Sequence, residues 1–439
     1  MTYEQAIAYL NALIDYERAP DFNYGAAFKL DRAIALMEAL GRPERAWSAL
    51  HVAGTKGKGS VATYLDALLR AHGAHTGLYT SPHLVSFRER VRIDGRQIPE
   101  AIFTDVMTVL EPWATRWQEE HPDSRLSFFD VLTGIGFEAF RRAHVGWGVV
   151  EVGMGGRLDA TNVVQPRAVV ITPIALEHTK YLGDTIAAIA REKAGVIKPG
   201  IPVVVGPQVP EARAVIVARA VECDADVTRL GRPGEADADV VVDESDDAWS
   251  LRADGIEFVD LRLRALGRHQ RWNFAAAVVA LNRAGVELDP RTVGAVAAET
   301  TIPGRLHLIP GDPPMLLDVA HTPDSARMLV RVLEEHFPGR RTTLIFGCAN
   351  DKRVAEVARV LAPAVERVLL VQLPGSRAMP MNEMLPAWRA AHPFVRDVAT
   401  VAAALENARA TTPSHGLIVA CGSFILVGAA MEALGYAPD

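Results

Sequence analysis

The chain has 439 residues, of which 49% are hydrophobic and 23% are charged, and its formal net charge is −7. This length exceeds one ordinary hydrophobic core, so the sequence predicts a soluble globular protein of two domains. The acidic balance disfavours nucleic-acid binding, and no run approaches the roughly 18 apolar residues of a membrane helix, so neither partner is expected.

The first fifty residues have helical patterns, over residues 3–17 and 28–41. Short β-rich runs then alternate with helical segments, and the strand candidates are residues 48–54, 75–81, 147–153, 167–176 and 201–206. Continuous apolar runs of this kind are typical of buried parallel strands in α/β proteins. Residues 237–265 instead indicate a small antiparallel meander, and residues 268–285 return to a helical pattern.

A segment rich in proline and glycine, residues 301–312, is the predicted linker. After it the alternation restarts, with strand candidates at residues 315–321, 342–349, 367–375 and 415–423. The sequence therefore predicts an α/β fold of two Rossmann-like domains. Residues 1–300 would form the nucleotide-binding domain and residues 313–439 a smaller second domain.

Cysteine usage and the N-terminus bear on the compartment. The three cysteines, Cys223, Cys348 and Cys421, are far apart and have no CxxC spacing. They indicate neither a disulfide framework nor a zinc site, which fits a reducing environment. The N-terminal residues lack the basic start and apolar stretch of a signal peptide. We therefore expect a cytoplasmic protein.

The stretch HVAGTKGKGS, residues 51–60, follows an apolar run and precedes a helical pattern. A loop in this position can surround phosphates with backbone N–H groups and a lysine. Its spacing departs from GxxxxGK[ST], because Val52 occupies the first glycine position and Gly59 separates Lys58 from Ser60. A glycine-rich turn with solvated lysines is the alternative. Two lysines between a strand and a helix favour phosphate binding.

The stretch EVGMGGRLDATN, residues 151–162, also follows an apolar strand candidate. It is a poor dinucleotide-binding fingerprint, because Leu158 stands where the third glycine belongs. Glu151 at the carboxyl end of a strand can instead hold a Mg²⁺ that bridges phosphates. A surface carboxylate before a turn is equally compatible with these residues.

Four further candidates each have a structural alternative. His178 follows a strand and can bind a metal, although a lone histidine there is more often a hydrogen-bonded structural residue. Lys193 is predicted near a helix C-terminus, where a solvated lysine is the simpler interpretation. Asp318 and His321 lie between a strand and a helix and can hold a nucleotide or orient a proton carrier. Asp318 can equally well hydrogen-bond only its own loop.

Nine stretches in chain order resemble the dihydrofolate synthase/folylpolyglutamate synthase family, within the ATP-dependent Mur ligase superfamily. Each is modest alone, but together they cover nearly the whole chain and are specific. The GKGS ending and the TSPHL loop are similar to the folate branch, since peptidoglycan ligases usually have threonine after the lysine. The nine are FKLDRAIALMEALG, HVAGTKGKGS, TSPHLVSFRERVRIDG, VVEVGMGGRLDATNVV, IALEHTKYLGDTIAAIAREKAGVIKPG, HQRWNFAAA, PGRLHLI, LDVAHTPDSA and CGSFILVG.

This resemblance implies roles for residues from every part of the chain. Lys58, Lys193 and His321 would be catalytic, and Lys193 would carry a carbamate that helps to organise the metals. Ser81 and Glu151 would hold one Mg²⁺, and His178 and the Lys193 carbamate a second. Ser127, Phe129 and Asp159 would contact the pterin-bearing substrate. The ATP-binding residues would be Gly54, Thr55, Lys56, Gly57, Lys58, Gly59 and Ser60 at the phosphates, with Asn273, Arg305, Asp318 and His321 split between the domains.

The implied enzyme is an ATP-dependent amide ligase that adds L-glutamate to dihydropteroate, to folylpolyglutamates or to both through an acyl phosphate. It would use ATP as co-substrate with two Mg²⁺ and act on small molecules as a monomer. Alternatives are another Mur-type ligase, such as one acting on a cell-wall precursor, and a P-loop ATPase that ligates nothing. A dinucleotide oxidoreductase is disfavoured by Leu158.

Four residues depart from the family pattern. Lys56 stands where asparagine is common, Glu177 replaces a frequent aspartate, Thr322 a frequent asparagine and Asp130 a frequent glutamate. None of these changes removes a proposed metal ligand, so activity is still expected. They bear instead on the details of pterin recognition.

Overall fold

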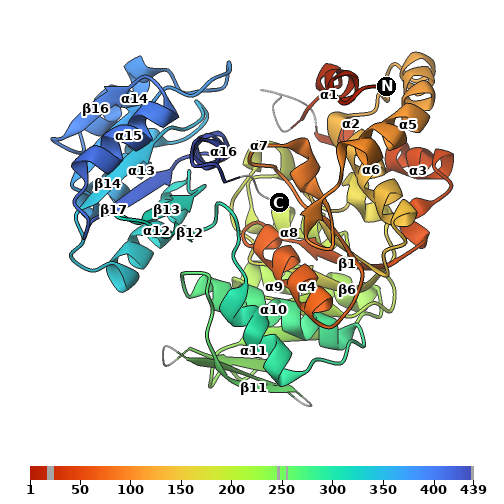
Figure 1. Ribbon diagram of the computed structural model, residues 1–439. Helices are drawn as coiled ribbons and strands as arrows, with labels where there is room; N and C mark the ends of the chain where they lie inside the picture. The colour runs from red at the N-terminus through yellow and green to blue at the C-terminus, as the bar shows by residue number, and fades with distance from the viewer. Residues whose placement is uncertain (17–23, 245–247, 254–255, 437–439) are drawn as a thin grey trace.

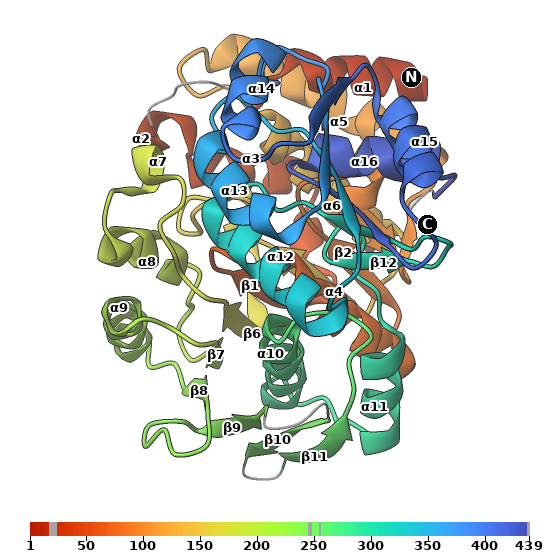
Figure 2. The same cartoon turned by 90° about the vertical axis from the view of Figure 1, so that its left-hand side faces the viewer.

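The computed structural model describes residues 1–16, 24–244, 248–253 and 256–436. It has two parts, each built on one β-sheet with helices on its faces (Figure 1). We call the part on the 11-stranded sheet the first domain and the part on the six-stranded sheet the second domain. The predicted α/β fold with two sheet domains is confirmed. Figure 2 shows α12 (Pro323–His336) and α13 (Val354–Leu361) of the second domain in front of the first.

The first-domain sheet has the strand order β11-β10-β9-β8-β7-β6-β1-β5-β2-β3-β4. Its strands from β9 to β2 pair in parallel, and antiparallel strands lie at both edges. The predicted meander of residues 237–265 is present as β9, β10 and β11. The strands are β1 Ser48–Ala53, β2 Thr76–Tyr79, β3 Val91–Ile93, β4 Arg96–Gln97, β5 Trp147–Glu151, β6 Pro166–Ile171, β7 Val203–Val205, β8 Val227–Gly231, β9 Val240–Asp243, β10 Trp249–Ala253 and β11 Ile256–Leu261.

Helices cover both faces of this sheet. The helical pattern of residues 3–17 forms α1 only as far as Ala12, and Glu17 lies outside the described residues. The helices are α1 Tyr3–Ala12, α2 Tyr24–Ala27, α3 Leu30–Ala39, α4 Lys58–Ala71, α5 Glu100–Glu120, α6 Phe128–Arg142, α7 Thr179–Leu182, α8 Ile186–Ala194, α9 Pro210–Glu222, α10 His269–Arg283 and α11 Pro290–Glu299, with short 3₁₀ turns η1 Pro43–Arg45, η2 Phe87–Arg90 and η3 Ala160–Val163.

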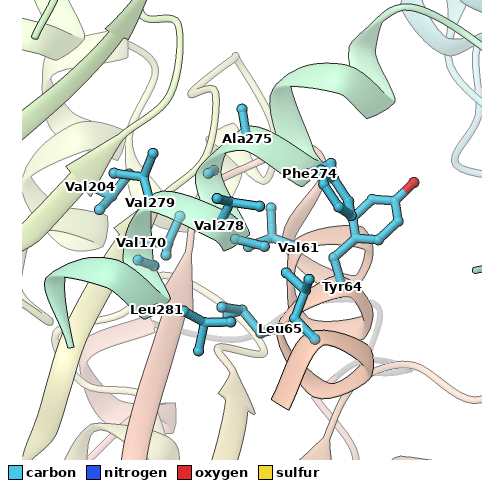
Figure 3. Packing of buried hydrophobic residues seen from close by; sticks show 14 of the residues in the cluster. Val61, Tyr64, Leu65, Val170, Val204, Phe274, Ala275, Val278, Val279 and Leu281 are labelled. Carbon is cyan, nitrogen blue, oxygen red and sulfur yellow. The ribbon is translucent and has the colours of Figure 1, made fainter. Parts of the chain in front are cut away.

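Helix α4, which begins at the glycine-lysine loop, is held by the core between the sheet and α10. Val61, Tyr64 and Leu65 of α4 point toward Phe274 and Val278 of α10 (Figure 3). These side chains are fully buried, and each contributes about 1.5–3 kcal/mol relative to an exposed position. This packing fixes the N-terminus of α4 beside the carboxyl end of β1.

The second-domain sheet has the order β12-β13-β17-β14-β15-β16, and only β12 runs antiparallel to its neighbour among the described strands. Strand β12 lies inside the segment predicted as linker. The sequence did not indicate this strand, because the three residues between Leu306 and Pro310 are too few to show a strand pattern. The elements not yet given are β12 His307–Ile309, β13 Met315–Asp318, β14 Thr342–Phe346, β15 Arg367–Val371, β16 Val395–Val398, β17 Leu417–Cys421, α14 Met381–Arg389, α15 Val401–Thr411, α16 Phe424–Ala433 and the 3₁₀ turn η4 Ala362–Ala364.

Within the described ranges, no helix is both long enough and apolar enough to cross a membrane.

Candidate active site

The loop between β1 and α4 is shaped by two glycines. Gly54 has φ +139°, and a Cβ there would lie 1.9 Å from Thr172 Oγ1. Gly57 has φ +91°, and its Cβ would lie 2.5 Å from Asn273 Oδ1. Both positions therefore exclude side chains, which lets the loop turn tightly into α4. Gly57 caps the helix without a side-chain hydrogen bond, so the N–H groups of the first turn can bind an anion.

Other loop residues are tied to the segment that follows β6. The N–H groups of Thr55 and Lys56 donate to the carbonyl of Pro173 at 3.0 and 3.3 Å. The Thr55 hydroxyl donates to the carbonyl of Ala175 and accepts from its N–H. Thr55 therefore holds the loop against its neighbour, a structural role that the glycine-rich spacing does not reveal.

Lys58 starts α4 and is half-buried. Over the described part of the chain, its Nζ has no hydrogen-bond or ion-pair partner. Its positive charge nevertheless favours the ionised form of Glu151 and lowers the pKa of Lys193. Lys58 is thus close to both groups and is available to a ligand.

Glu151 ends β5 next to the first turn of α4. Its carboxylate is 4% exposed and accepts a hydrogen bond from the backbone N–H of Ser81 at 3.0 Å. A Cβ on Gly59 would lie 3.4 Å from the same carboxylate oxygen. Burial raises the pKa of Glu151, and the charge of Lys58 opposes this shift. The structure therefore brings Ser81 and Glu151 together, and Glu151 is not the surface carboxylate of the alternative interpretation.

Lys193 lies in the last turn of α8 but does not point to solvent. Its side chain is buried, and Nζ donates to the carbonyl oxygen of Gly54 at 2.6 Å. Burial, reinforced by the charge of Lys58, lowers the pKa of Lys193 to about 7. The interpretation of Lys193 as a solvated helix lysine is wrong, because the helix packs its last turn against the loop.

Glu177 and His178 follow β6 and lie close enough to Lys58 for its charge to lower the pKa of both groups. His178 is exposed and adopts φ +53° immediately before α7. Glu177 forms an ion pair with Lys56, whose charge holds the pKa of that carboxyl at about 2 against the opposing effect of burial. Two of the residues that depart from the family pattern, Lys56 and Glu177, are therefore partners.

The second domain contributes residues at the carboxyl end of β13. Asp318 is half-buried and accepts hydrogen bonds from the N–H groups of Leu306 and Ala320, both at 2.8 Å. These two bonds shape the loop of Asp318, and its role in nucleotide binding stays a prediction. His321 Nδ1 lies 2.7 Å from the carbonyl of Val319, so Nδ1 carries the proton and Nε2 is an acceptor.

Charges of the first domain reach His321 across the domain boundary. Burial lowers the pKa of His321 to about 4. Two first-domain residues have smaller effects on this pKa: the charge of Lys56 lowers it further, and that of Glu177 raises it. Arg305 stacks on the ring of Phe424 at 4.9 Å and favours ionised Glu151. Asn273 contacts the loop at Gly57. Of the residues predicted to share the nucleotide, Asn273 thus contacts the loop, and Arg305 and His321 are close enough to the first domain to interact electrostatically with its charged residues.

The three residues predicted to contact the pterin-bearing substrate lie around the loop after β5. Ser127 caps α6 and donates to Asp130 Oδ2 at 2.7 Å. Asp159 is fully buried and accepts from the N–H groups of Met154 and Thr161. Phe129 is partly exposed, and its ring packs so closely on Gly153 that a Cβ there would clash with it. In this arrangement Asp159 supports the loop, Ser127 supports the start of α6, and Phe129 alone of the three presents surface.

A buried hydrogen-bond chain behind this loop was not predicted. His51 Nε2 lies 3.0 Å from Thr161 Oγ1, which in turn donates to Asp159 Oδ1 at 2.5 Å. All three side chains are fully buried. His51 belongs to β1, where a single polar residue in an apolar run gives no sign of its partner. The loop after β5 leads into η3 and not into an α-helix, so the dinucleotide interpretation is wrong.

A cleft of about 630 Å³ opens where the two domains meet. Gly59, Ser81 and Glu151 line it from the first domain, and Arg305 and Phe424 line it from the other side. Across the described ranges, no group of three or more histidine, cysteine or acidic side chains is placed to hold a metal ion. A cation at Glu151 would therefore take its remaining ligands from a hydroxyl such as that of Ser81, from water or from phosphate oxygens.

Comparison with known proteins agrees with this architecture. A model of the Mur ligase glutamate ligase domain matches residues 304–424, and with the loop, the cleft and the two sheets it defines a Mur-type ligase. The chain is 35% identical over 391 residues to folylpolyglutamate synthase of Lacticaseibacillus casei, covering 87% of this chain and 88% of that protein. It is 36% identical over 449 residues to dihydrofolate synthase/folylpolyglutamate synthase of Mycobacterium tuberculosis, covering 93% and 91%.

Solved structures give the same assignment. Mycobacterium tuberculosis folylpolyglutamate synthase complexed with ADP has a TM-score of 0.88 at 33% identity, over 100% of this chain and 99% of that one. A bifunctional enzyme from Yersinia pestis complexed with AMPPNP and Mn ion has a TM-score of 0.84 at 28% identity, over 99% and 98%. The chain belongs to the folylpolyglutamate synthase/dihydrofolate synthase family and is an ATP-dependent glutamate ligase.

Proposed function

We propose that the chain adds L-glutamate both to dihydropteroate and to reduced folates that already carry glutamate. Relatives that are named for both activities support the two acceptors. The observation that carries the ligation chemistry is the convergence of Lys58, Glu151 and Lys193 where β1 and β5 have their carboxyl ends. His321 faces the same region from the second domain. A site that joins two anionic substrates to a triphosphate needs such positive and metal-binding groups in one place.

ATP binds with its phosphates on residues 54–60 and the first turn of α4. The uncapped N–H groups of this turn supply positive charge together with Lys58, whose ammonium has no partner among the residues that the structure describes. Asn273, Arg305, Asp318 and His321 hold the rest of the nucleotide between the domains. Gly57 is essential in this arrangement, because any side chain would displace Asn273 from the loop.

The residues around Glu151 fit a divalent cation. Its buried carboxylate and the nearby Ser81 provide hard oxygen donors of the kind that Mg²⁺ prefers, with room in the cleft for phosphate and water. His178 and a carbamate on Lys193 would hold a second ion. Bound Mg²⁺ would neutralise the charge that develops on the transferred phosphoryl group.

The reaction follows from these positions. A carboxylate oxygen of the folate substrate attacks the γ-phosphorus of ATP, which gives an acyl phosphate and releases ADP. Lys58 lies where it stabilises the phosphoryl oxygens during this transfer. The amine of L-glutamate then attacks the acyl carbon, and inorganic phosphate leaves with its bridging oxygen. His321 Nε2, which is unprotonated at neutral pH, can accept the proton that the amine loses.

The pterin end of the substrate rests on Phe129 beside the loop of residues 153–156. Asp159 would act chiefly by shaping that loop, where its carboxylate accepts N–H groups, and Ser127 by capping α6, which carries Phe129. We expect the enzyme to act as a monomer, which is what the family resemblance implies.

The test is release of phosphate from ATP, measured with and without L-glutamate. It is run separately with dihydropteroate and with the monoglutamate of tetrahydrofolate. Glutamate-dependent turnover with both acceptors, and products heavier by one glutamyl residue, would support the proposal. Turnover with only one acceptor would restrict it, and glutamate-independent phosphate release would contradict it. A UDP-sugar peptide acceptor serves as the control for a cell-wall ligase.

A further inference from the structure

Helix α16 of the second domain contacts the first domain through the backbone of one glycine. A Cβ built on Gly428 would lie 2.1 Å from the carbonyl oxygen of Leu84 and 2.8 Å from its carbonyl carbon. Real Cβ atoms essentially never approach that closely, so the loop and the helix touch only because residue 428 has no side chain. Helix α16 lies on the side of the second domain that faces the first (Figure 1).

The side chain of Leu84 completes the contact. It packs against the second-domain core cluster that contains Leu426 and Val427. Gly304, at φ +68°, leaves space for it, because a Cβ there would lie 3.2 Å from Leu84 Cδ2. Leu84 thus sits in a socket made by the start of the second domain and by α16.

The same loop reaches the centre of the active site. Ser81, three residues before Leu84, donates its N–H to Glu151. Between Ser81 and Leu84, His83 Nδ1 accepts a hydrogen bond from Arg90 Nε at 3.0 Å. From Leu84 on, the buried carboxylate of Glu89 accepts the N–H groups of Leu84, Val85 and Ser86 at 2.8, 2.7 and 2.6 Å, so both parts of the loop are tied to the turn at residues 89–90. Displacing Leu84 would therefore displace Ser81 as well.

We propose that Gly428 is a positioning residue for the ligase reaction. Because Gly428 has no side chain, α16 packs directly on Leu84. This contact sets how closely the second domain approaches the loop of residues 54–60 and keeps Ser81 against Glu151. Arg305 and Phe424, which line the cleft opposite Ser81, flank the socket in sequence and would move with it. The inference rests on the proposed function only in that turnover is read as glutamate ligation.

The test compares Gly428→Ala with a matched control in the full-length protein. Gly294 is also a helical glycine, in α11, but a Cβ there meets nothing within 4 Å. Spin labels on Val221→Cys and Phe394→Cys, which are 75% and 67% exposed in the first and second domains, report the distance between the domains. Thermal unfolding, kcat and the KM for ATP are measured on the same variants.

We expect Gly428→Ala to lengthen or broaden the interdomain distance and to lower kcat by on the order of 100-fold, as a misplacement of about 1 Å can. Gly294→Ala should change neither. Leu84→Ala removes the side chain from the socket without creating a clash, and it should also lengthen or broaden the interdomain distance. If Gly428→Ala does not fold, Leu84→Ala provides the test.

Normal distances and normal kcat in a folded Gly428→Ala, or in Leu84→Ala if that alone folds, would overturn the inference. Absence of glutamate-dependent turnover in the unmutated enzyme would count against the proposed function instead. The distance measurement would still decide whether α16 is seated through Gly428.

Discussion

The side-chain nitrogen of Lys193 lies 2.6 Å from the carbonyl oxygen of Gly54, which joins the end of α8 to the start of the glycine-lysine loop. The lysine is buried there without a carboxylate partner among the described residues. This amine is buried and close to Lys58. Its conversion to an anionic carbamate would therefore reverse the local charge and supply oxygen ligands for a metal.

We therefore expect a carbamate on Lys193. With ¹³C-labelled bicarbonate, the unmutated enzyme should show a carbamate carbon signal by NMR, and Lys193→Met should lose both this signal and turnover. Short carboxylates should restore part of the activity of Lys193→Ala. Lys198→Met is the control, because Lys198 also donates to a buried carbonyl, that of Asn162, outside the site. A bare amine in saturating bicarbonate would refute the expectation.

Lys58→Ala should abolish turnover and leave stability nearly unchanged. The ammonium has no partner in the described structure, so its removal should alter the free energy of unfolding by no more than about 0.5 kcal/mol. Steady-state kinetics and thermal unfolding measured side by side check both statements. Near-normal turnover in this variant would show that the loop does not act on the transferred phosphoryl group.

Glu151→Gln should raise the Mg²⁺ concentration needed for half-maximal activity. The amide oxygen can still accept the Ser81 N–H, so the loop should stay in place while the negative charge is lost. Chelation should abolish activity in the unmutated enzyme. Titrating Mg²⁺ into both proteins makes the comparison, and identical curves would exclude Glu151 as a ligand.

Loss of Lys56 alone should weaken ATP binding, because it leaves Glu177 as an uncompensated negative charge near the phosphates. Lys56→Met should raise the KM for ATP, and adding Glu177→Gln should recover part of the loss. The pair should contribute only about 0.2–1 kcal/mol to stability, since Lys56 is half exposed. If the double variant binds ATP no better than Lys56→Met, the charge argument fails.

His51 should make the protein less stable in mild acid. Burial holds the pKa of His51 at about 3, below its ordinary 6.5, so the unfolded chain binds the extra proton as the pH falls through 6.5. At pH 5 this costs about 2 kcal/mol of the free energy of unfolding. The pKa of Asp159 is raised by burial to about 6, and its effect has the opposite sign.

A variant separates these two groups. His51→Gln keeps a donor for Thr161 but does not titrate, so its free energy of unfolding should fall less between pH 7 and pH 5 than that of the unmutated protein. Chemical denaturation at several pH values measures the difference. Equal slopes would mean that His51 does not remain neutral in the folded state.

Local patterns were enough to predict the sheets and to predict that the site forms at the carboxyl ends of the parallel strands. Apolar runs marked β1, β5 and β6, and parallel pairing necessarily brings the residues that follow them to one side. Contacts between distant segments were beyond such patterns. The Lys56–Glu177 pair joins residues 121 apart, and the Gly428–Leu84 contact depends on the meeting of two domains.

The burial of Lys193 shows the limit most clearly. A lysine at a helix C-terminus favours solvent on local grounds, and only the family resemblance pointed to the site. Its actual environment is decided by how α8 packs under the loop. Asp159 shows the converse, since a residue expected to meet substrate is instead bonded within its own loop.

The central claim is ligation of L-glutamate through an acyl phosphate, and the fate of one oxygen atom tests it most directly. The folate acceptor is prepared with ¹⁸O in the reacting carboxylate and turned over with ATP and L-glutamate. The account predicts that each inorganic phosphate released carries one ¹⁸O, which mass spectrometry detects. Phosphate without ¹⁸O, formed while the amide product accumulates, would contradict it.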